Sequence, residues 1–405
     1  APQRWRMQIM EQWMGKAFVV GVLLIVLAAG RDAWAALPRS TAMPPKPAYE
    51  VGVSVYFDAW AARKADTCLR TAKPADCEYT RLRDLASEKD LIKARLDDLV
   101  ALHANTVILT IPIGIDRWAA TTVYKDPLLT PTDEQIAYFV REARSRGLYV
   151  TIKPLIDETV IRQTTPTGKP NWRGGIEPSD PARFFANYAA VYTDYAQLAA
   201  LAGADRLVIG TELNSLEAPR YEGHWRDIIA TIRAAVGTKV TLIYGQNWNP
   251  DYPFPAWFAQ LDELGVDAYY PLLGVSDQGT AADLVSAFNQ TVVPAMKMSP
   301  RQELERLKAQ FPGKKLRILE MGIPSTAGRY AAPWKTEDGV VNLAIQTTYT
   351  EAACQFFGPE AGVADGIFWW AYGLWDIPNP QSDGSHDITG KPAEQALSRC
   401  FASRK

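Results

Sequence analysis

Short apolar runs alternate with amphipathic segments along the chain from residue 51 onward. Apolar runs of about four to eight residues are typical of buried strands, whereas longer segments with a period of about 3.6 residues are typical of helices. The apolar runs predict eight strands, at residues 51–57, 106–112, 148–154, 206–211, 239–244, 266–270, 316–320 and 366–371. The amphipathic segments predict helices at residues 88–103, 132–146, 181–201, 224–236, 299–311, 340–357 and 391–401. Repeated units of this kind form parallel barrels, so we expect one α/β domain, a (β/α)8 TIM barrel, over residues 51–405.

The connections in this pattern are of two lengths. Those from a helix to the next strand are short, and Gly147 and Gly203 stand where such a turn needs a positive φ. Those from a strand to the next helix are long, at residues 59–87, 155–180, 245–255, 271–298, 321–339 and 372–390. In a barrel, the long βα loops all lie at the carboxyl ends of the strands, where binding sites are built. We therefore expect the functional site at that end.

The first 50 residues have a different pattern. Basic residues precede an uninterrupted apolar stretch of 14 residues, 17–30, and Ala33-Trp34-Ala35 offers the small residues of a signal-peptide cleavage site. The stretch is shorter than the roughly 20 apolar residues of a membrane-spanning helix, so residues 1–36 are expected to be an export signal and the protein periplasmic or secreted. If the stretch is not cleaved, it would act as a membrane tether. The proline-rich residues 37–50 are predicted to be a linker.

Composition argues against several classes of function. The net charge is -2, the pI is about 6.1, and no basic tract with interleaved aromatic residues occurs, which argues against a nucleic-acid partner. The sequence also lacks the glycine-rich, G-x-S-x-G and H-E-x-x-H motifs of nucleotide-binding proteins, serine hydrolases and zinc proteases.

Four cysteines become candidates for disulfides if the protein is exported. We expect the pairings Cys68–Cys77 and Cys354–Cys400, one of the three connectivities that four cysteines allow. A zinc site is the rival interpretation. Because no C-x-x-C spacing occurs and the chain has only three histidines, we expect no metal and no organic cofactor.

Two glutamates stand where predicted strands end. Glu212 follows Leu207-Val-Ile-Gly-Thr at the fourth strand, and Glu320 closes Leu316-Arg-Ile-Leu at the seventh. Because the carboxyl ends of barrel strands open onto one face, the two side chains can converge on one substrate bond. Paired carboxylates are the machinery of glycoside hydrolysis. Taken singly, each glutamate could instead pair with a nearby arginine or a helix N-terminus.

Seven segments carry a resemblance to a known family. They are Lys153-Pro154, Asn171-Trp-Arg-Gly, Phe185-Ala-Asn-Tyr, Tyr195-Ala-Gln-Leu-Ala, Ile209-Gly-Thr-Glu-Leu, Glu320-Met-Gly and Gly390-Lys-Pro-Ala. With these segments the chain resembles the family-113 β-mannanases, members of a large clan of retaining barrel glycosidases. The resemblance implies a retaining glycoside hydrolase with Glu212 as general acid/base, Glu320 as nucleophile and β-1,4-mannan as the first substrate to test. Xylan, a glucan or an exopolysaccharide stays open, because substrate identity depends on loops.

The resemblance also has geometric consequences. Retention requires the two carboxyl groups to lie about 5–5.5 Å apart, whereas a separation of about 6.5–9.5 Å favours inversion. In one respect the chain departs from the wider clan: Thr211 precedes the acid where most members have an asparagine. The contact to the sugar 2-hydroxyl must then come from another residue, for which Asn214 is a candidate.

Aromatic side chains in the expected loops could stack on sugar rings. The candidates are Trp172, Trp248, Trp370 and Trp375, with packing in the core or loops as the alternative role. Adjacent strand residues point to opposite faces, so only one of Trp369 and Trp370 can face the site, and we favour Trp370.

Two adjacent tyrosines, Tyr269 and Tyr270, pose the same choice. The resemblance implies that one donates its hydroxyl to the nucleophile while the other packs outward. Lys153 ends an apolar strand, where it could bind sugar hydroxyls and keep nearby carboxylates ionised. Alternatively, Lys153 forms a salt bridge with Asp157 or Asp58 that only closes the barrel mouth.

Arg173 and Asn247 are further candidates for substrate contact, and His386 lies in an expected loop without an evident partner. Two other functions remain open at this stage. One is an enzyme that trims or transglycosylates an exopolysaccharide in the cell envelope. The other is a sugar-binding barrel without catalysis, which would bind sugar without turnover.

Overall fold

The computed structural model describes residues 43–57, 85–127, 129–335, 339–374, 377 and 379–404. Several expectations fall outside these residues and keep the standing of predictions: the export signal at residues 1–36, Asp58, the Cys68–Cys77 pairing and Trp375. Within the described ranges, no helix has both the length and the apolar character needed to cross a membrane.

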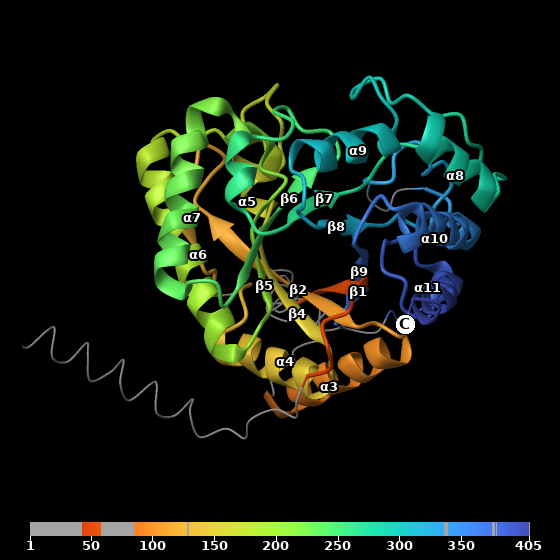
Figure 1. Cartoon of the computed structure of the whole chain (residues 1–405), viewed down its shortest axis with the longest axis horizontal. Coiled ribbons are helices and arrows are strands. Elements are labelled where there is room, and N and C mark those ends of the chain that lie inside the picture. The colour runs from red at the N-terminus through yellow and green to blue at the C-terminus, as the bar shows by residue number, and fades with distance from the viewer. Residues whose placement is uncertain are drawn as a thin grey trace, which may run out of the picture. The chain divides into compact units, whose positions relative to one another are not determined.

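Eight parallel strands close into a barrel (Figure 1). They are β1 (Glu50–Tyr56), β2 (Thr106–Ile115), β4 (Tyr149–Ile156), β5 (Arg206–Thr211), β6 (Thr241–Asn247), β7 (Leu264–Asp267), β8 (Leu316–Met321) and β9 (Gly366–Gly373). Each strand pairs with the next in this order, and closure comes from β1, which pairs with both β2 and β9. The predicted (β/α)8 TIM barrel is confirmed. A short strand, β3 (Val123–Tyr124), adds an antiparallel pair to the end of β2.

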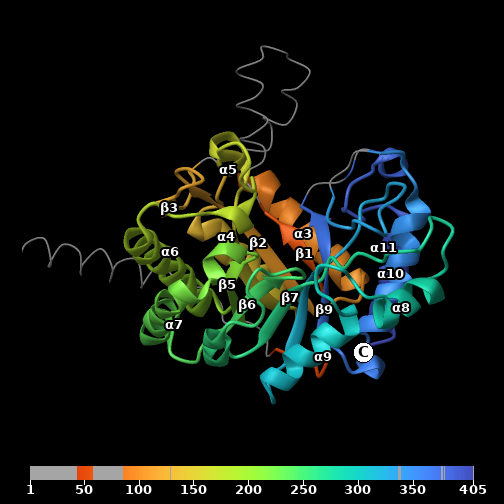
Figure 2. The same ribbon diagram turned by 90° about the horizontal axis from the view of Figure 1, so that it is seen from above.

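Helices surround the strands (Figure 2). They are α3 (Leu85–Ala101), α4 (Asp133–Ser145), α5 (Thr159–Thr164), α6 (Pro181–Ala202), α7 (Glu222–Val236), α8 (Ala281–Gln290), α9 (Pro300–Gln310), α10 (Leu343–Phe357) and α11 (Pro392–Ala402). Short 3₁₀ helices lie in the loops: η2 (Arg173–Gly175), η3 (Asn214–Glu217), η4 (Pro219–Tyr221), η5 (Ala256–Gln260), η6 (Pro359–Ala361) and η7 (Pro380–Ser382).

All of the predicted helices are present, but α5 and α8 lie in segments expected to be loops. The α5 helix has 6 residues, which is too few for a periodic pattern in the sequence. The α8 helix begins with a capping box between Thr280 and Asp283. That local signal was readable in the sequence. Figure 2 shows α5 and β3 on the same side, and both follow the carboxyl ends of barrel strands.

Local chemistry explains where the long helices begin and end. The Thr132 side chain accepts a hydrogen bond from the Gln135 backbone amide, and the Gln135 side chain accepts one from the Thr132 backbone amide. This pair of bonds caps α4. Asp180 caps α6, whose first residue is a proline, and Gly203 ends that helix with a φ of 85°.

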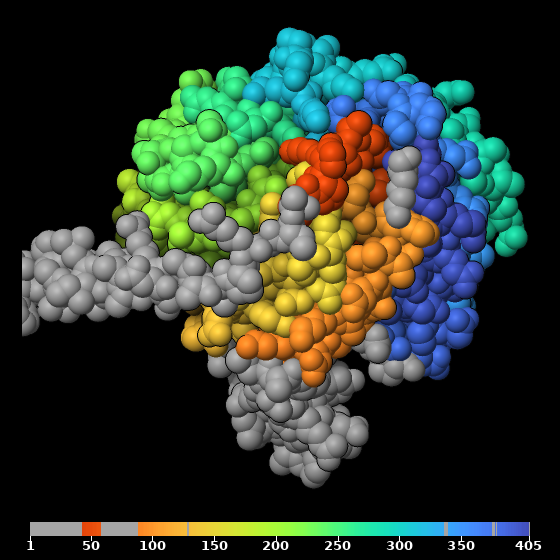
Figure 3. All heavy atoms as spheres, turned by 60° about the horizontal axis from the view of Figure 1, so that its bottom comes forward, coloured from red at the N-terminus to blue at the C-terminus, as the bar shows by residue number. Residues whose placement is uncertain are grey.

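The first described residues, from Met43 onward, fall inside the range expected to be a linker. The Tyr149 hydroxyl donates to the Pro44 carbonyl at 2.8 Å, and Tyr49 and Glu50 are buried. In Figure 3 the first described residues, coloured red, lie beside the orange, yellow and blue segments of the chain. Residues 43–50 are held because a buried aromatic ring and a buried ion pair outweigh the extended preference of the prolines.

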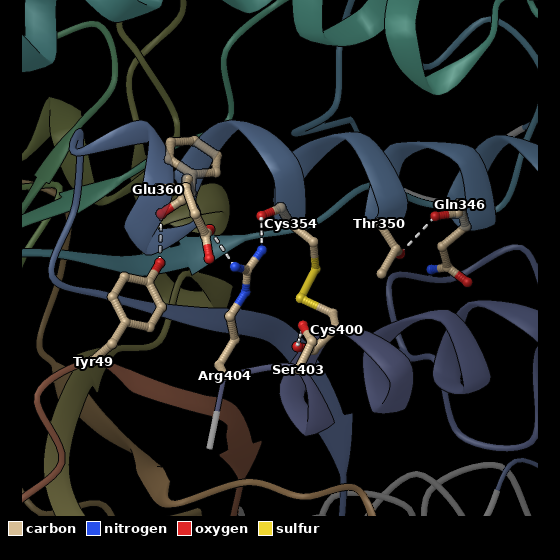
Figure 4. Close-up of a disulfide and its surroundings, with 9 residues drawn as sticks. Tyr49, Gln346, Thr350, Cys354, Glu360, Cys400, Ser403 and Arg404 are labelled. Atoms are coloured by element: carbon tan, nitrogen blue, oxygen red, sulfur yellow. Dashed lines mark hydrogen bonds and ion pairs between the residues drawn. A yellow bond between two sulfur atoms is a disulfide. The ribbon is translucent and has the colours of Figure 1, made fainter.

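The C-terminal helix is fastened to its neighbour by a disulfide (Figure 4). Cys354 of α10 and Cys400 of α11 are bonded, with their Cα atoms 6.1 Å apart. The Arg404 guanidinium donates to the Cys354 carbonyl at 3.2 Å and pairs with the exposed Glu360. These contacts tie the chain end to the α10 side of the barrel.

The barrel contains a small apolar cluster of its own. It is formed by Ile108, Val208, Ile243, Leu319 and Phe368, all strand residues that are fully buried. A separate and much larger apolar core fills the space between the strands and the helices. The small cluster matters for the site, because it lies midway along the strands and separates the polar residues at their two ends.

Candidate active site

Glu212 lies directly after the end of β5, where the backbone makes an abrupt turn. Its φ is 52°, in the left-handed region that side chains rarely adopt. The backbone is held there because the Glu212 amide donates to the Gly245 carbonyl at 2.8 Å. The Leu213 amide donates to the Tyr244 hydroxyl at 3.0 Å. Non-glycine residues with positive φ cluster at active sites, where the surrounding structure fixes them.

A buried glutamate supports this turn from behind. Glu217 accepts a hydrogen bond from the Tyr244 hydroxyl at 2.8 Å and another from the Gln246 side chain at 2.9 Å. Burial raises the pKa of Glu217 to about 8, although both hydrogen bonds oppose the shift. Glu217 therefore acts on the backbone beside Glu212 through Tyr244.

Glu320, in β8, is held by two donors. Lys153 of β4 donates to its Oε1 atom, and the Tyr269 hydroxyl donates to its Oε2 atom at 2.8 Å. Two hydrogen-bond donors, one of them an ammonium, favour the carboxylate form and fix the orientation of the group. Burial and the Glu320 charge raise the pKa of Tyr269 well above its ordinary value, so its hydroxyl stays a donor.

Lys153 is fully buried and is shared by two carboxyl groups. Besides Glu320, its Nζ atom lies 3.7 Å from the Oδ1 atom of Asp267, the last residue of β7. Burial lowers the pKa of Lys153, but Asp267 and Glu320 outweigh it and the pKa is raised. The alternative expectation of a salt bridge from Lys153 to Asp157 is wrong, because the ammonium faces the centre.

Arg173, in η2, bridges two other carboxyl groups. Its Nη1 atom donates to Glu212 Oε2 at 2.8 Å, and its Nη2 atom lies 3.2 Å from Glu158 Oε1. Burial raises the pKa of Glu158, but Arg173 and Arg162 outweigh burial, so its pKa is lowered. Glu158 is therefore the ionised partner of Arg173.

Glu212 has the pKa of a group that can both give and take a proton near neutrality. Burial is the largest cause of its shift; Arg173 opposes burial and the Glu320 charge adds to it. Together these effects raise the pKa of Glu212 from 4.5 to about 7. The Glu320 charge favours the protonated form of Glu212, and a group that holds a proton beside an ionised carboxylate is what acid/base chemistry at one bond requires.

Trp370 of β9 faces this centre, whereas Trp369 does not. The Lys153 ammonium lies 5.9 Å from the centre of the Trp370 ring, and Tyr56 of β1 meets that ring edge to face. Trp369 is fully buried against Tyr349 of α10. Adjacent strand residues have thus gone to opposite faces, as alternation requires.

Trp248 and Trp334 form a stacked pair beyond the ends of the strands. Their ring centres are 5.0 Å apart, and Trp334 keeps 42% of its surface exposed. The pair is linked to the centre through the loops: the Trp248 amide donates to the Asp267 carbonyl, and the His386 ring bonds to the Pro333 carbonyl. His386 also meets the Tyr269 ring edge to face. The expectation that His386 has no partner is therefore wrong.

The remaining candidates occupy different surroundings. Tyr270 is fully buried, and burial together with Glu303 of α9 raises its pKa, so it is the outward-packing member of the tyrosine pair. The Asn214 side chain donates to the Asn249 carbonyl at 3.0 Å, which leaves its carbonyl oxygen without a hydrogen bond among the described residues. Asn247 ends β6 and accepts from the Asn249 amide. Trp172 is half buried, with its ring packed over Gly174.

Sequence reasoning missed four residues of this region: Glu158, Glu217, Asp267 and Trp334. Asp267 was readable in principle, because it interrupts an apolar strand in the same way as Lys153. The other three lie in loops or short 3₁₀ turns, where no periodic pattern marks a side chain.

The chain matches the family model of Glycoside Hydrolase Family 113 over residues 84–391. It belongs to this family. As a family-113 member, the protein is a glycoside hydrolase and its substrate is a carbohydrate. No curated protein sequence matches the chain.

Solved structures agree on the fold. The chain is similar to a GH113 β-mannanase from Alicyclobacillus acidocaldarius, with 24% identity and a TM-score of 0.63 over 78% of this chain and 92% of that one. It is also similar to a GH113 β-1,4-mannanase, with 19% identity and a TM-score of 0.64 over 88% of this chain and 99% of that one. A β-glucuronidase from Ruminococcus gnavus is similar with a TM-score of 0.50 and 10% identity, over 88% of this chain and 50% of that one.

Proposed function

We propose that this family-113 enzyme hydrolyses a β-linked polysaccharide, β-1,4-mannan first, with retention of anomeric configuration by double displacement. The observation that carries the proposal is the difference between the two glutamates. Glu320 accepts hydrogen bonds from Lys153 and Tyr269, whereas burial raises the pKa of Glu212 to about 7. One carboxylate and one carboxylic acid at a shared centre are the parts of a retaining glycosidase. Two of the similar solved structures are β-mannanases, which supports mannan.

In the first step, an oxygen of Glu320 attacks the anomeric carbon while Glu212 gives its proton to the leaving glycosidic oxygen. Glu320 becomes an ester and Glu212 a carboxylate, so one negative charge passes from the first residue to the second. Arg173, 2.8 Å from Glu212, stabilises that new charge. In the second step, Glu212 takes a proton from water, and the hydroxide so formed attacks the anomeric carbon and frees Glu320.

The stacked pair of Trp248 and Trp334 supports a polymer as the substrate. A flat, partly exposed indole can cover the C–H face of a pyranose ring. Because the pair lies in loops beyond the strand ends, it would contact a sugar unit away from the bond that is cut. A single-sugar glycoside would gain nothing from this contact.

The test is reducing-end release by the full-length protein from β-mannan, xylan, glucans and bacterial exopolysaccharides. We expect one polymer to be cut, and both Glu212→Gln and Glu320→Gln to lose activity by at least about 10³-fold while staying folded. Glu360→Gln, at an exposed position, is the matched control and should keep activity. Cleavage that survives Glu320→Gln would contradict the mechanism. Sugar binding without turnover across the panel would favour a binding protein, and transfer to an acceptor sugar would favour a transglycosidase.

Proton NMR of the first product distinguishes retention from inversion. A β-linked substrate should release a β-anomer before mutarotation, and initial release of the α-anomer would contradict the double displacement. The pH profile gives a second criterion. Because Glu212 must be protonated to act as the acid, kcat/KM should fall as the pH rises above about 7.

We also propose that the enzyme is exported. The apolar residues 17–30 with the small residues after them, and the Cys354–Cys400 disulfide, support an oxidising compartment. Cell fractionation with mass spectrometry of the N-terminus tests this. A chain that starts near residue 36 outside the cytoplasm is expected, whereas an intact chain in the membrane fraction would favour a tether.

A further inference from the structure

Asp267 is a buried carboxyl group that differs from its neighbours at the carboxyl end of the barrel. It is fully buried at the end of β7, and neither of its oxygens has a hydrogen-bond partner in the described part of the chain. Its nearest cation, the Lys153 ammonium, lies 3.7 Å away and donates its hydrogen bond to Glu320 instead. An ionised carboxylate in such a place would be costly, because burial of a charge needs both a partner and hydrogen bonds.

The space for this carboxyl is made by a glycine. A Cβ atom on Gly245 of β6 would lie 3.0 Å and 3.2 Å from the two Asp267 oxygens. The side chain therefore fits against bare backbone, and a larger residue at position 245 would crowd it. On its other side β7 pairs with β8, and Asp267 stands opposite Glu320.

The charged groups around Asp267 are unequal in number. Three cations, Lys153, Arg173 and the exposed Arg162, face four carboxyl groups: Glu158, Glu212, Glu320 and Asp267. The titratable groups that act on Asp267 from the neighbouring elements are Lys153, Glu320, Glu212, Arg173, Tyr269 and Tyr244. Glu158, Glu212 and Glu320 each have a cation within hydrogen-bond distance, whereas the nearest cation to Asp267 lies 3.7 Å away. Ionisation is therefore least favourable for Asp267.

We propose that Asp267 is a positioning residue that carries a proton through the catalytic cycle and holds the Lys153 ammonium in place against Glu320. The proposal rests on the proposed function, because it takes Glu320 as the nucleophile. Asp267 does not touch the sugar, since it is fully buried. It acts through Lys153, whose position decides how well the nucleophile is oriented.

With Asp267 neutral, the net charge of the centre is the same in both halves of the reaction. When the bond between Glu320 and the anomeric carbon forms, the bond to the leaving oxygen breaks and the Glu212 proton goes to that oxygen. One negative charge has moved from Glu320 to Glu212, and none has been gained or lost. Lys153 then faces an ester. The C=O oxygen of the neutral Asp267 side chain keeps the ammonium from moving away. An ionised Asp267 would instead hold Lys153 away from Glu320.

The kinetic test compares two substitutions at this position. Asparagine has the shape of a protonated aspartic acid, so Asp267→Asn should keep kcat and leave both limbs of the pH profile where they are. Asp267→Ala removes the contact to Lys153 and should lower kcat by about 10- to 100-fold with KM unchanged, the loss of one interaction with a charged group. Rescue by asparagine separates positioning from a general packing defect.

Two results would overturn the proposal. If Asp267→Asn moves the limbs of the pH profile down by about one unit, Asp267 is ionised, because its removal has taken a negative charge from beside the glutamates. If Asp267→Ala keeps the wild-type kcat, Lys153 does not depend on Asp267.

Infrared spectroscopy tests the proton without any substrate, so it separates this proposal from the proposed function. The difference spectrum between the wild type and Asp267→Asn at pH 7 should contain the C=O stretch of a carboxylic acid. Glu263→Gln is the matched control, because arginines lower the pKa of Glu263 to about 2 against the opposing effect of burial, and its difference spectrum should contain only carboxylate bands. Carboxylate bands for Asp267 as well would refute the proposal even if the enzyme is active.

Discussion

Both ends of this barrel bury charged side chains, but with opposite consequences. At the amino ends of the strands, Arg206 and Arg317 face Glu50 and Glu263, two cations against two anions. At the carboxyl ends, three cations, one of them the exposed Arg162, face four carboxyl groups. The ratio of charges, and not burial alone, therefore decides whether a buried acid is ionised.

At the amino end every charge has a partner of opposite sign. The four ion pairs between these residues have separations of 2.7–3.1 Å, and Arg206 also donates to the Thr151 hydroxyl. Burial works to raise the pKa values of the two glutamates, but the arginines outweigh it. The pKa of Glu50 is lowered, and that of Glu263 falls to about 2. The two glutamates at this end therefore stay ionised near neutral pH, paired with the two arginines.

At the carboxyl end burial prevails over the cations that are available. The pKa values of Glu212 and Asp267 are raised, with burial as the largest cause in both. The apolar cluster of Ile108, Val208, Ile243, Leu319 and Phe368 lies between the two ends and separates them in space. Acids with raised pKa values at the carboxyl end therefore coexist with acids of lowered pKa at the amino end.

The largest effect is expected from removal of a cation at the amino end. Arg317→Met leaves Glu50 and Glu263 short of one partner in a buried site, which should lower the free energy of unfolding by about 3–5 kcal/mol. Urea unfolding measures the loss. The folded fraction should keep the wild-type kcat, because Arg317 lies near the amino end of its strand and contacts no residue of the active site among those described. A strong change in kcat without a loss of stability would break the comparison.

A glutamate-to-glutamine substitution should change the free energy of unfolding in opposite directions at the two ends of the barrel. The pKa of folded Glu212 is raised from 4.5 to about 7, so its stabilising contribution is present below pH 4.5 and lost as the pH rises through 7. Glu212→Gln should therefore stabilise the protein by about 3 kcal/mol at pH 8 and hardly at all at pH 4.

Glu263 is the matched case. Its folded pKa is about 2, below the ordinary 4.5, so its contribution is present above pH 4.5 and lost as the pH falls through 2. Glu263→Gln should destabilise the protein by about 3 kcal/mol at pH 7. Unfolding of both variants, measured from pH 4 to 8, gives the signs. Equal signs at pH 7 would mean that the charge ratio does not control these acids.

A smaller effect is expected at the rim of the catalytic end. Trp334→Ala removes the exposed member of the stacked pair and should raise KM for long oligosaccharides by about 2- to 10-fold, the value of one aromatic stacking contact. The kcat value and KM for the shortest cleaved substrate should not change. Leu201→Ala, at an exposed apolar position on α6, is the control. An equal effect on short and long substrates would place Trp334 outside the polymer-binding region.

The smallest effect is expected where the amino end meets solvent. Lys46 lies 3.9 Å from both Glu50 and Glu263, but its side chain is 40% exposed. Lys46→Ala should change the free energy of unfolding by roughly 0–1 kcal/mol, as exposed ion pairs do. Urea unfolding in low and high salt measures it. A loss of stability as large as that of Arg317→Met would show that the two arginines do not by themselves balance the charges of Glu50 and Glu263.

Much of the catalytic end could be predicted from the sequence. Glu212 and Glu320 each end an apolar run, and Lys153 interrupts one. Period-two alternation predicted that only one of Trp369 and Trp370 faces the centre, and the structure shows that it is Trp370. Glu158 and Trp334 could not be found in this way, because their loops carry no periodic pattern. The amino-end cluster was missed for another reason. Its four members look like ordinary charges at strand starts until the barrel closes.

The sequence by itself determined the alternation of strands and helices, the faces that side chains take within a strand, and the two strand-end glutamates. These are local properties, set by steric alternation and by the apolar period. Only the tertiary structure decided which charges share a burial site. Glu50 and Arg317 meet because β1 and β8 both pair with β9, and Lys153 reaches Asp267 and Glu320 across the barrel. The protonation of a buried acid depends on all the charges near it, and these charges come from segments that are far apart in the sequence.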